Sequence, residues 1–79
     1  MSTKSVTVFS TQTCPFCHMV KDYLKSKNIA FSDIDVSQDR MQAMKMVQKS
    51  GQMGVPQLWI DEEVVVGFDK PRINALLSI

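Results

Sequence analysis

The sequence predicts an α/β fold in which a four-stranded mixed sheet is flanked by three helices. The chain has 79 residues, which suffices for a single domain, residues 1–79. Segments with strand-like and helix-like patterns follow one another in the order strand, helix, strand, helix, strand, strand, helix. Apolar residues make up 44% of the chain and charged residues 22%, which is typical of an ordinary globular domain.

The first half of the chain predicts two parallel strands joined by a helix. Residues 5–10 alternate apolar and polar side chains, as a strand does. A helix should follow, capped by Thr13, with Pro15 in its first turn and a stop near Asn28. Residues 31–36 form a second strand. Because a crossover helix separates the two strands, we expect them to pair in parallel.

The second half predicts a helix followed by a hairpin. Asp39 and Gln42 have the spacing of a capping box, and the helix that they begin should end at Gly51. Residues 57–60 and 64–66 are two short apolar segments joined by acidic residues, which indicates an antiparallel hairpin.

A third helix should close the chain. Asp69 can cap it, Pro71 fits its first turn, and its buried stripe would consist of Ile73, Leu76 and Leu77. The predicted sheet then carries helices on both faces.

Methionines are frequent in and after the second predicted helix. The set comprises Met41, Met44, Met46 and Met53. Methionines could form a soft-metal surface, but their helical spacing favours filling of the core. Trp59 is expected to lie in the sheet, packed under a helix.

Charge and hydropathy exclude several functional classes. The net charge of +1 gives no electrostatic case for binding nucleic acid or an anionic membrane. The apolar runs are too short to span a bilayer. Residues 1–6 show no pattern of a secretory signal, so a cytoplasmic protein is expected.

The two cysteines, Cys14 and Cys17, lie where the first strand meets the first helix. A structural disulfide closing so short a loop would restrain little of the unfolded chain, so chemistry explains the pair better. At the helix start, Cys14 would face unpaired N–H groups and the positive end of the helix dipole, which stabilise a thiolate. The pattern predicts that Cys14 attacks a disulfide and that Cys17, one turn further in, resolves the mixed disulfide.

Two metal-based alternatives concern the same motif. Together with His18, the Cys-Pro-Phe-Cys segment also matches the attachment signature of c-type haem. Haem attachment normally accompanies export, for which the sequence shows no signal. A zinc site would need further ligands, because two thiols and one adjacent histidine cannot close a tetrahedral shell. We expect neither a metal nor a haem.

Over essentially its whole length the sequence resembles the glutaredoxins. The segment Cys-Pro-Phe-Cys at 14–17 is similar to the family's Cys-Pro-aromatic-Cys active site. The Val-Pro pair at 55–56 resembles the pair whose proline is cis and faces the cysteines. The Gly-Phe-Asp segment at 67–69 resembles the Gly-x-Asp segment that opens the last helix. The resemblance implies the thioredoxin-like fold.

The resemblance also implies roles for individual residues. Cys14 is the nucleophile and Cys17 the resolving thiol. Val55 would offer its backbone to an extended thiol substrate as an added strand. A cis bond before Pro56 would turn the chain sharply toward Cys14. The residues implied in substrate binding are Pro15, Phe16, Val55, Pro56, Gly67, Phe68 and Asp69.

The departures from the family pattern concern the reductant. Glutathione-using members often carry a lysine three residues before the nucleophile, where this chain has Thr11. Residues 52–54, Gln-Met-Gly, lack the cation that many relatives place there, and Val66 replaces the first glycine of a Gly–Gly pair. The chain is therefore similar to the short glutaredoxin-like redoxins, which include those that reduce ribonucleotide reductase and draw electrons from thioredoxin reductase.

The implied function is that of a monomeric protein-disulfide reductase. Its partners would be disulfide-containing proteins, with thioredoxin reductase or glutathione as reductant. The redox-active Cys14–Cys17 disulfide would be its redox group, without a bound cofactor, and glutathione could serve as a co-substrate. The alternative is a glutathione-dependent glutaredoxin that holds an iron–sulfur cluster in a dimer. Pro15 argues against it, because cluster-binding relatives tend to have a small or polar residue there.

Overall fold

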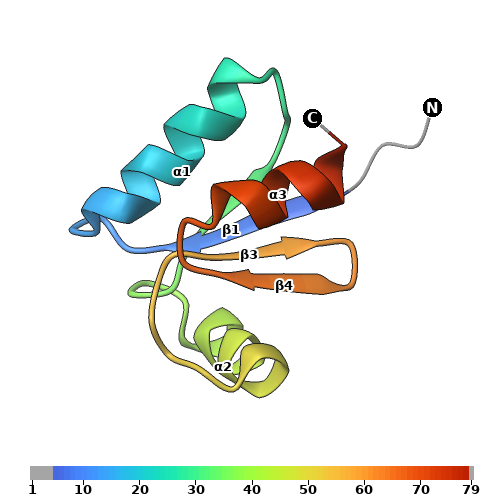
Figure 1. The fold of residues 1–79 in the computed structure, drawn as a ribbon. Helices are drawn as coiled ribbons and strands as arrows, with labels where there is room; N and C mark the ends of the chain where they lie inside the picture. The colour runs from blue at the N-terminus through green and yellow to red at the C-terminus, as the bar shows by residue number, and fades with distance from the viewer. Residues whose placement is uncertain (1–4, 79) are drawn as a thin grey trace.

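The computed structural model of the protein describes residues 5–78. Figure 1 shows its elements, which are β1 (Val6–Ser10), α1 (Pro15–Ser26), β2 (Ser32–Asp35), α2 (Arg40–Ser50), β3 (Gln57–Ile60), β4 (Glu63–Val66) and α3 (Lys70–Leu77). Their kinds and order confirm the prediction. The expectation that no secretory signal is present rests mainly on residues 1–4, which lie outside the described residues. Within residues 5–78, no helix is long and apolar enough to cross a membrane.

The strands form one mixed sheet in the order β2-β1-β3-β4. β1 pairs with β2 in parallel, and β3 pairs with both β1 and β4 in antiparallel fashion, as predicted. In this register Phe9 lies opposite Gln57, and Gln57 lies opposite Val66. The last residues of β1 and β4 and the first residue of β3 therefore meet at one edge of the sheet.

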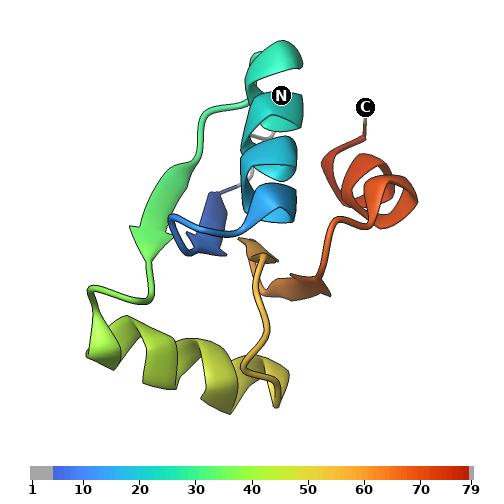
Figure 2. The ribbon, with the colours of Figure 1, turned by 90° about the vertical axis from the view of Figure 1, so that its left-hand side faces the viewer.

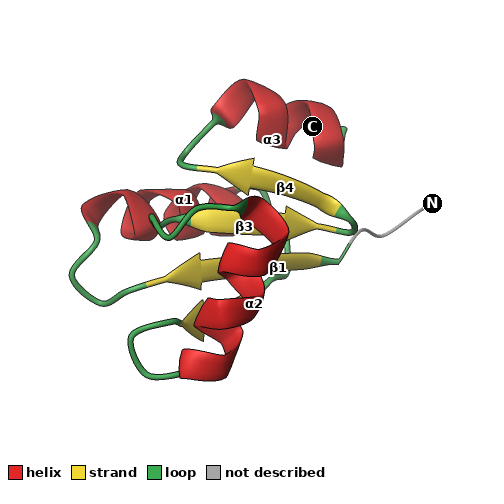
Figure 3. Ribbon diagram, turned by 90° about the horizontal axis from the view of Figure 1, so that it is seen from below, coloured by secondary structure: helices red, strands yellow, loops and turns green. Residues whose placement is uncertain are grey.

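Helices cover both faces of the sheet. α1 and α3 lie on one face and α2 lies on the other (Figures 2 and 3). The face under α1 and α3 holds the main apolar core, whose buried members are Val6, Val8, Val20, Leu24, Leu58, Ile60, Val65 and Ile73. Burial of these eight side chains, each worth roughly 1.5–3 kcal/mol, is the main force that fixes α1 and α3 on the sheet.

The face under α2 has a smaller apolar cluster. The rings of Phe9 and Trp59 lie 4.6 Å apart between their centroids. Lys49 places its ammonium group 4.7 Å from the centroid of the Trp59 ring, which is a cation–π distance. Trp59 thus packs under a helix, as expected.

The prediction that the methionines fill the core is right for Met46 and wrong for the others. Met46 is 2% exposed, whereas Met41, Met44 and Met53 are 70%, 57% and 80% exposed. The cause is the rotational phase of α2. At 3.6 residues per turn, packing Met46 against the sheet directs residues 41 and 44 toward solvent.

The residue that caps α1 also differs from the prediction. Cys14, not Thr13, is the N-cap, with an extended backbone and a sulfur that accepts the N–H of Cys17 at 3.2 Å. Pro15 is the first helical residue, so the cap falls on the residue directly before it, and Thr13 stands one position too early.

The other helix ends follow their sequence signals. The carboxylate of Asp39 accepts the N–H of Gln42 at 3.1 Å, and α2 ends at Gly51 with a left-handed φ of 75°. The carboxylate of Asp69 accepts the N–H of Arg72 at 3.3 Å and so caps α3. Asn28 has a left-handed φ of 59°, just after α1 ends.

Candidate active site

The cysteine pair lies at the sheet edge where β1 and β4 end and β3 begins. Cys14 occupies the short connection from β1 to α1, and α1 starts above this edge (Figure 1). The segment that joins α2 to β3 returns to the same edge (Figure 2). The topology therefore gathers the three segments that the family resemblance singled out, 14–17, 55–56 and 67–69.

Direct contacts link these three segments. The thiol of Cys14 lies 3.8 Å from the carbonyl oxygen of Val55, to which it donates. The next carbonyl, that of Pro56, accepts the N–H of Gly67 at 2.8 Å. The Val55–Pro56 peptide bond is cis, as predicted. Gly67 has a φ of 81°, a left-handed conformation that favours glycine, and leads from β4 into α3.

Cys14 is partly accessible and lies among hydrogen-bond donors. Both cysteines are free thiols in the structure, and Cys14 is half-buried. Its sulfur accepts the N–H of Cys17 at 3.2 Å, one of the N–H groups that the first turn of a helix leaves unpaired. A negative charge on this sulfur would be stabilised by that N–H and by the helix dipole. The geometry suits a nucleophile that a substrate can reach.

Cys17 has the opposite environment. It is fully buried, and burial raises the pKa of its thiol to about 11, with further upward contributions from the hydrogen bond to Cys14 and from the charge of Cys14. A hydrogen bond with the Thr11 backbone and the charge of Lys21 act in the other direction. At pH 7 a thiol with this pKa is ionised in roughly one molecule in ten thousand, so Cys17 is neutral in the reduced protein.

Formation of a mixed disulfide at Cys14 would change the environment of Cys17. Once the Cys14 sulfur is bonded to a substrate, it carries no charge and interacts less with the Cys17 thiol. Two of the influences that raise the pKa of Cys17 then weaken, although burial remains. The Cys17 thiol would therefore be easier to ionise in such a mixed disulfide than in the reduced protein.

Lys21 is a functional candidate that the sequence placed on a solvated helix face, together with Lys25 and Lys27, and did not connect with the cysteine site. It lies one turn after Cys17 on α1, and its charge lowers the pKa of the Cys17 thiol. Its ammonium group pairs with Asp33 at 3.1 Å, and the buried Ser10 hydroxyl donates to the same carboxylate at 2.9 Å. The i, i+4 spacing from Cys17 was the signal that could have identified it.

Gln57 is a second residue that the sequence did not single out. Its side chain is fully buried at the start of β3, and its amide nitrogen donates to the carbonyls of Gln52 and Gly54 at 2.9 and 2.7 Å. These bonds hold the segment that leads into Val55. A polar residue beginning an otherwise apolar strand was the available signal, because buried amides almost always have partners.

The remaining predicted site residues have different environments. Pro15 and Phe16 are exposed beside Cys14, with Phe16 at 59%. Phe68 is half-buried and packs against the main core, its ring 5.8 Å from that of Tyr23. Asp69 is exposed, and one of its carboxylate oxygens is engaged as the α3 cap.

Alkylation should distinguish the two thiols. In the reduced protein at pH 7, iodoacetamide should modify Cys14 at least about a hundred times faster than Cys17, because Cys17 is buried and neutral. The rate at Cys17 should rise about tenfold per pH unit and level off near its pKa of about 11. Peptide mass mapping measures both rates. Denatured protein, as the control, should label both cysteines alike; equal labelling in the folded protein would contradict the assignment.

Comparisons with known proteins agree with this fold. The glutaredoxin family model matches residues 6–65. A glutaredoxin-like 8.6 kDa protein in the rubredoxin operon of Clostridium pasteurianum is 44% identical over 73 residues, covering 92% of this chain and 97% of its own length. Glutaredoxin 3 of Escherichia coli K12 is 32% identical over 65 residues, covering 82% and 78%.

Solved structures show the same architecture. A variant of the thioredoxin-like protein BC3987 superposes with a TM-score of 0.89 at 32% identity, covering 100% of this chain and 99% of that chain. NrdH-redoxin of Escherichia coli has a TM-score of 0.79 at 22% identity, covering 91% and 93%, and supports the fold. Members of the matched family are thiol–disulfide oxidoreductases. The chain belongs to the glutaredoxin family and has its thioredoxin-like fold.

Proposed function

We propose that this protein reduces protein disulfides by dithiol exchange, with Cys14 as nucleophile and Cys17 as resolving thiol. The observation that carries the proposal is the contrast between the two sulfurs. That of Cys14 is partly accessible and accepts an N–H of the first turn of α1, whereas Cys17 is buried with a pKa raised to about 11.

The reaction consists of two exchanges. The Cys14 thiolate attacks one sulfur of the substrate disulfide, the S–S bond breaks, and the other substrate sulfur leaves as a thiolate that takes a proton from water. Cys17 then loses its proton and attacks the Cys14 sulfur, which releases the second substrate thiol. The substrate gains two electrons, and the protein holds the corresponding oxidation as a Cys14–Cys17 disulfide.

The backbone of Val55 supplies the surface on which a substrate can align. It leads into β3 beside Cys14, and among residues 5–78 the Val55 N–H has no hydrogen-bond partner. An extended substrate segment can pair with this backbone as an added strand, which places its disulfide over Cys14. Pro15, Phe16 and the segment 67–69 border the same place and would contact the flanking substrate residues.

The reductant that returns two electrons to the Cys14–Cys17 disulfide is, in this proposal, a thioredoxin-reductase-type enzyme. Thr11 and residues 52–54 carry no cation with which to hold the carboxylates of glutathione. The reaction needs only one copy of the protein, because each chain contains both thiols.

Intact mass spectrometry tests the proposal in a single turnover. Reduced protein mixed with one equivalent of insulin should lose two hydrogens while insulin gains two, because one insulin disulfide is reduced to two thiols. Protein alkylated at Cys14 beforehand is the control and should leave the mass of insulin unchanged. Insulin reduction without a change in the protein's mass would overturn the dithiol mechanism, and so would no reduction at all.

A further inference from the structure

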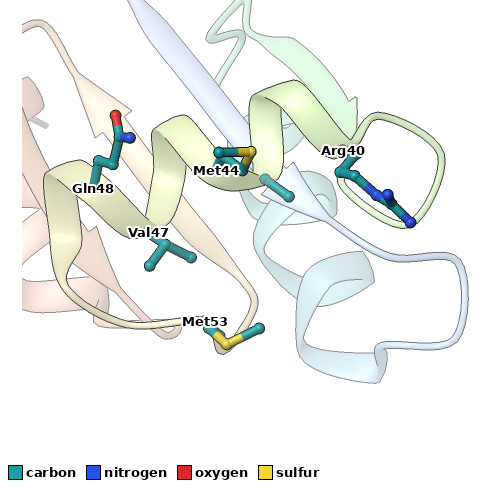
Figure 4. A pocket seen from close by; sticks show the side chains of 6 residues that line it. Arg40, Met44, Val47, Gln48 and Met53 are labelled. Carbon is teal, nitrogen blue, oxygen red and sulfur yellow. The ribbon is translucent and has the colours of Figure 1, made fainter.

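An apolar groove runs along the outer side of α2. Arg40, Ala43, Met44, Val47, Gln48 and Met53 line it and enclose a volume of about 370 Å³. Figure 4 shows Met53, on the segment after α2, facing Met44 and Val47 of the helix. Met44 and Met53 are 57% and 80% exposed, so their thioethers are available to a partner.

The methionines of this groove contribute little to the fold. α2 packs on the sheet through Met46, which is 2% exposed. A polar side chain would serve an exposed helix position as well as methionine does, so two exposed methionines across a groove indicate contact with something apolar. The unbranched, polarisable thioether adapts to side chains of different shapes, which suits a surface that receives more than one sequence.

The charged side chain that lines the groove is that of Arg40. α2 carries Arg40, Lys45 and Lys49 and contains no acidic residue, and the carboxylate of Asp39, directly before the helix, caps it by accepting the N–H of Gln42. Lys49 lies over Trp59, on the sheet side of the helix. The ion pairs among residues 5–78 are Lys21–Asp33 and Arg72–Glu63, so Arg40 lines the groove as an uncompensated cation. A ligand that matches this groove would have apolar side chains for its lining and carboxylates near them for Arg40.

The groove is continuous with the cysteine site. Met53 stands two residues before Val55, whose carbonyl contacts the Cys14 thiol. Gln57, fully buried, fixes this connection by donating to the carbonyls on either side of Met53, those of Gln52 and Gly54. A chain aligned with Val55 can therefore continue over Met53 into the groove.

We propose that this groove binds a segment of the substrate protein that is rich in acidic and apolar residues. This segment lies a few residues away from the substrate cysteine that Cys14 attacks. The inference deepens the proposed function and rests on it. The groove would distinguish one protein substrate from another. Small disulfides would react at Cys14 without contacting the groove.

Three chromogenic probes test this selection. Each has one cysteine that carries thionitrobenzoate through a disulfide, so attack by Cys14 on the peptide sulfur releases the coloured thiol. One probe has an extension of Leu, Met, Asp and Glu, the second has Lys in place of the acidic residues, and the third is a capped cysteine without extension. Extensions are placed before and after the cysteine in separate peptides. The measured quantity is the second-order rate constant with reduced protein.

The wild-type protein should react about tenfold faster with the acidic probe than with the capped cysteine, in the better of the two orientations. Arg40→Glu should lower the preference for the acidic over the basic probe by about three- to tenfold. Met44→Gln should lower the advantage of the acidic probe over the capped cysteine by about fivefold or more. Met41→Gln is the matched control, because Met41 is an exposed methionine of α2 outside the groove, and it should keep the wild-type ratios.

Two results would overturn the groove assignment while leaving the proposed function intact. One is equal reactivity of all three probes with the wild-type protein. The other is a loss of preference in Met41→Gln as large as in Met44→Gln. A wild-type protein that fails to react with the capped cysteine would instead overturn the proposed function, and this inference with it.

Discussion

Replacing Cys17 with serine is expected to preserve the first attack and to stop the protein at a covalent adduct with its substrate. Serine is of similar size, so the buried site keeps its packing, and the Cys17 backbone N–H that contacts the Cys14 sulfur is unaffected. No second thiol remains to release the substrate from Cys14. The adduct should accumulate stoichiometrically and disappear on addition of a small thiol, which intact mass spectrometry measures.

Cys14→Ser is expected to lower disulfide reductase activity by about a thousandfold or more, because the attacking atom is lost. The remaining thiol, Cys17, is buried, with its pKa raised by burial. Thr13→Ala is the matched control. Thr13 is exposed and does not cap α1, so this change should keep near wild-type activity and alter stability by less than about 0.5 kcal/mol. Substantial activity in Cys14→Ser would refute the assignment of the two thiols.

The second large effect concerns the reductant. Glutathione with its reductase should support turnover at least about tenfold more slowly than a thioredoxin-reductase-type enzyme. Glutathione carries two carboxylates, and each missing charge-assisted hydrogen bond costs about 1.5–3 kcal/mol, or roughly ten- to a hundredfold in affinity. Lys21 lines the same hollow as Thr11 but is paired with Asp33 at 3.1 Å, and Lys49 lies over Trp59.

Thr11→Lys tests the reason for this preference. It places a cation three residues before Cys14, and we expect it to raise kcat/KM for glutathione by about tenfold. Thr13→Lys adds the same charge one residue from Cys14, at an exposed position, and serves as the control, with a smaller gain. The interpretation fails if wild-type protein turns over faster with millimolar glutathione than with thioredoxin reductase, or if both lysines act alike.

The sequence predicts the order and pairing of the elements because each has a strong local signal. Asp39, Gly51 and Asp69 mark helix ends through bonds to their own neighbours, which sequence spacing reveals. The site is predictable for a related reason. The predicted bounds of β1 and α1 already place Cys14 in the connection between them. A parallel β1–β2 pair with an antiparallel β3 brings Val55, which precedes β3, to the same edge of the sheet.

The features that the sequence did not predict depend on tertiary structure. Met41, Met44 and Met46 have the same chemistry, and only the rotation of α2 on the sheet decides that Met46 is buried. Gln57 is polar and is buried because the segment before Val55 bends back to present two carbonyls to its amide. Both of these hydrogen bonds are local in sequence, but residue spacing alone does not reveal the loop conformation that permits them.

The capping of α1 by Cys14 couples the redox state of the protein to the helix. In the reduced form the sulfur is an acceptor for the Cys17 N–H, and this bond is strongest when the sulfur is charged. In a disulfide the same sulfur is neutral and a weaker acceptor, so oxidation withdraws part of the cap. An interaction that stabilises the first turn of α1 only in the reduced form therefore makes reduction of the Cys14–Cys17 disulfide more favourable. The helix end thus serves both as a structural element and as a determinant of the driving force with which electrons pass through the site.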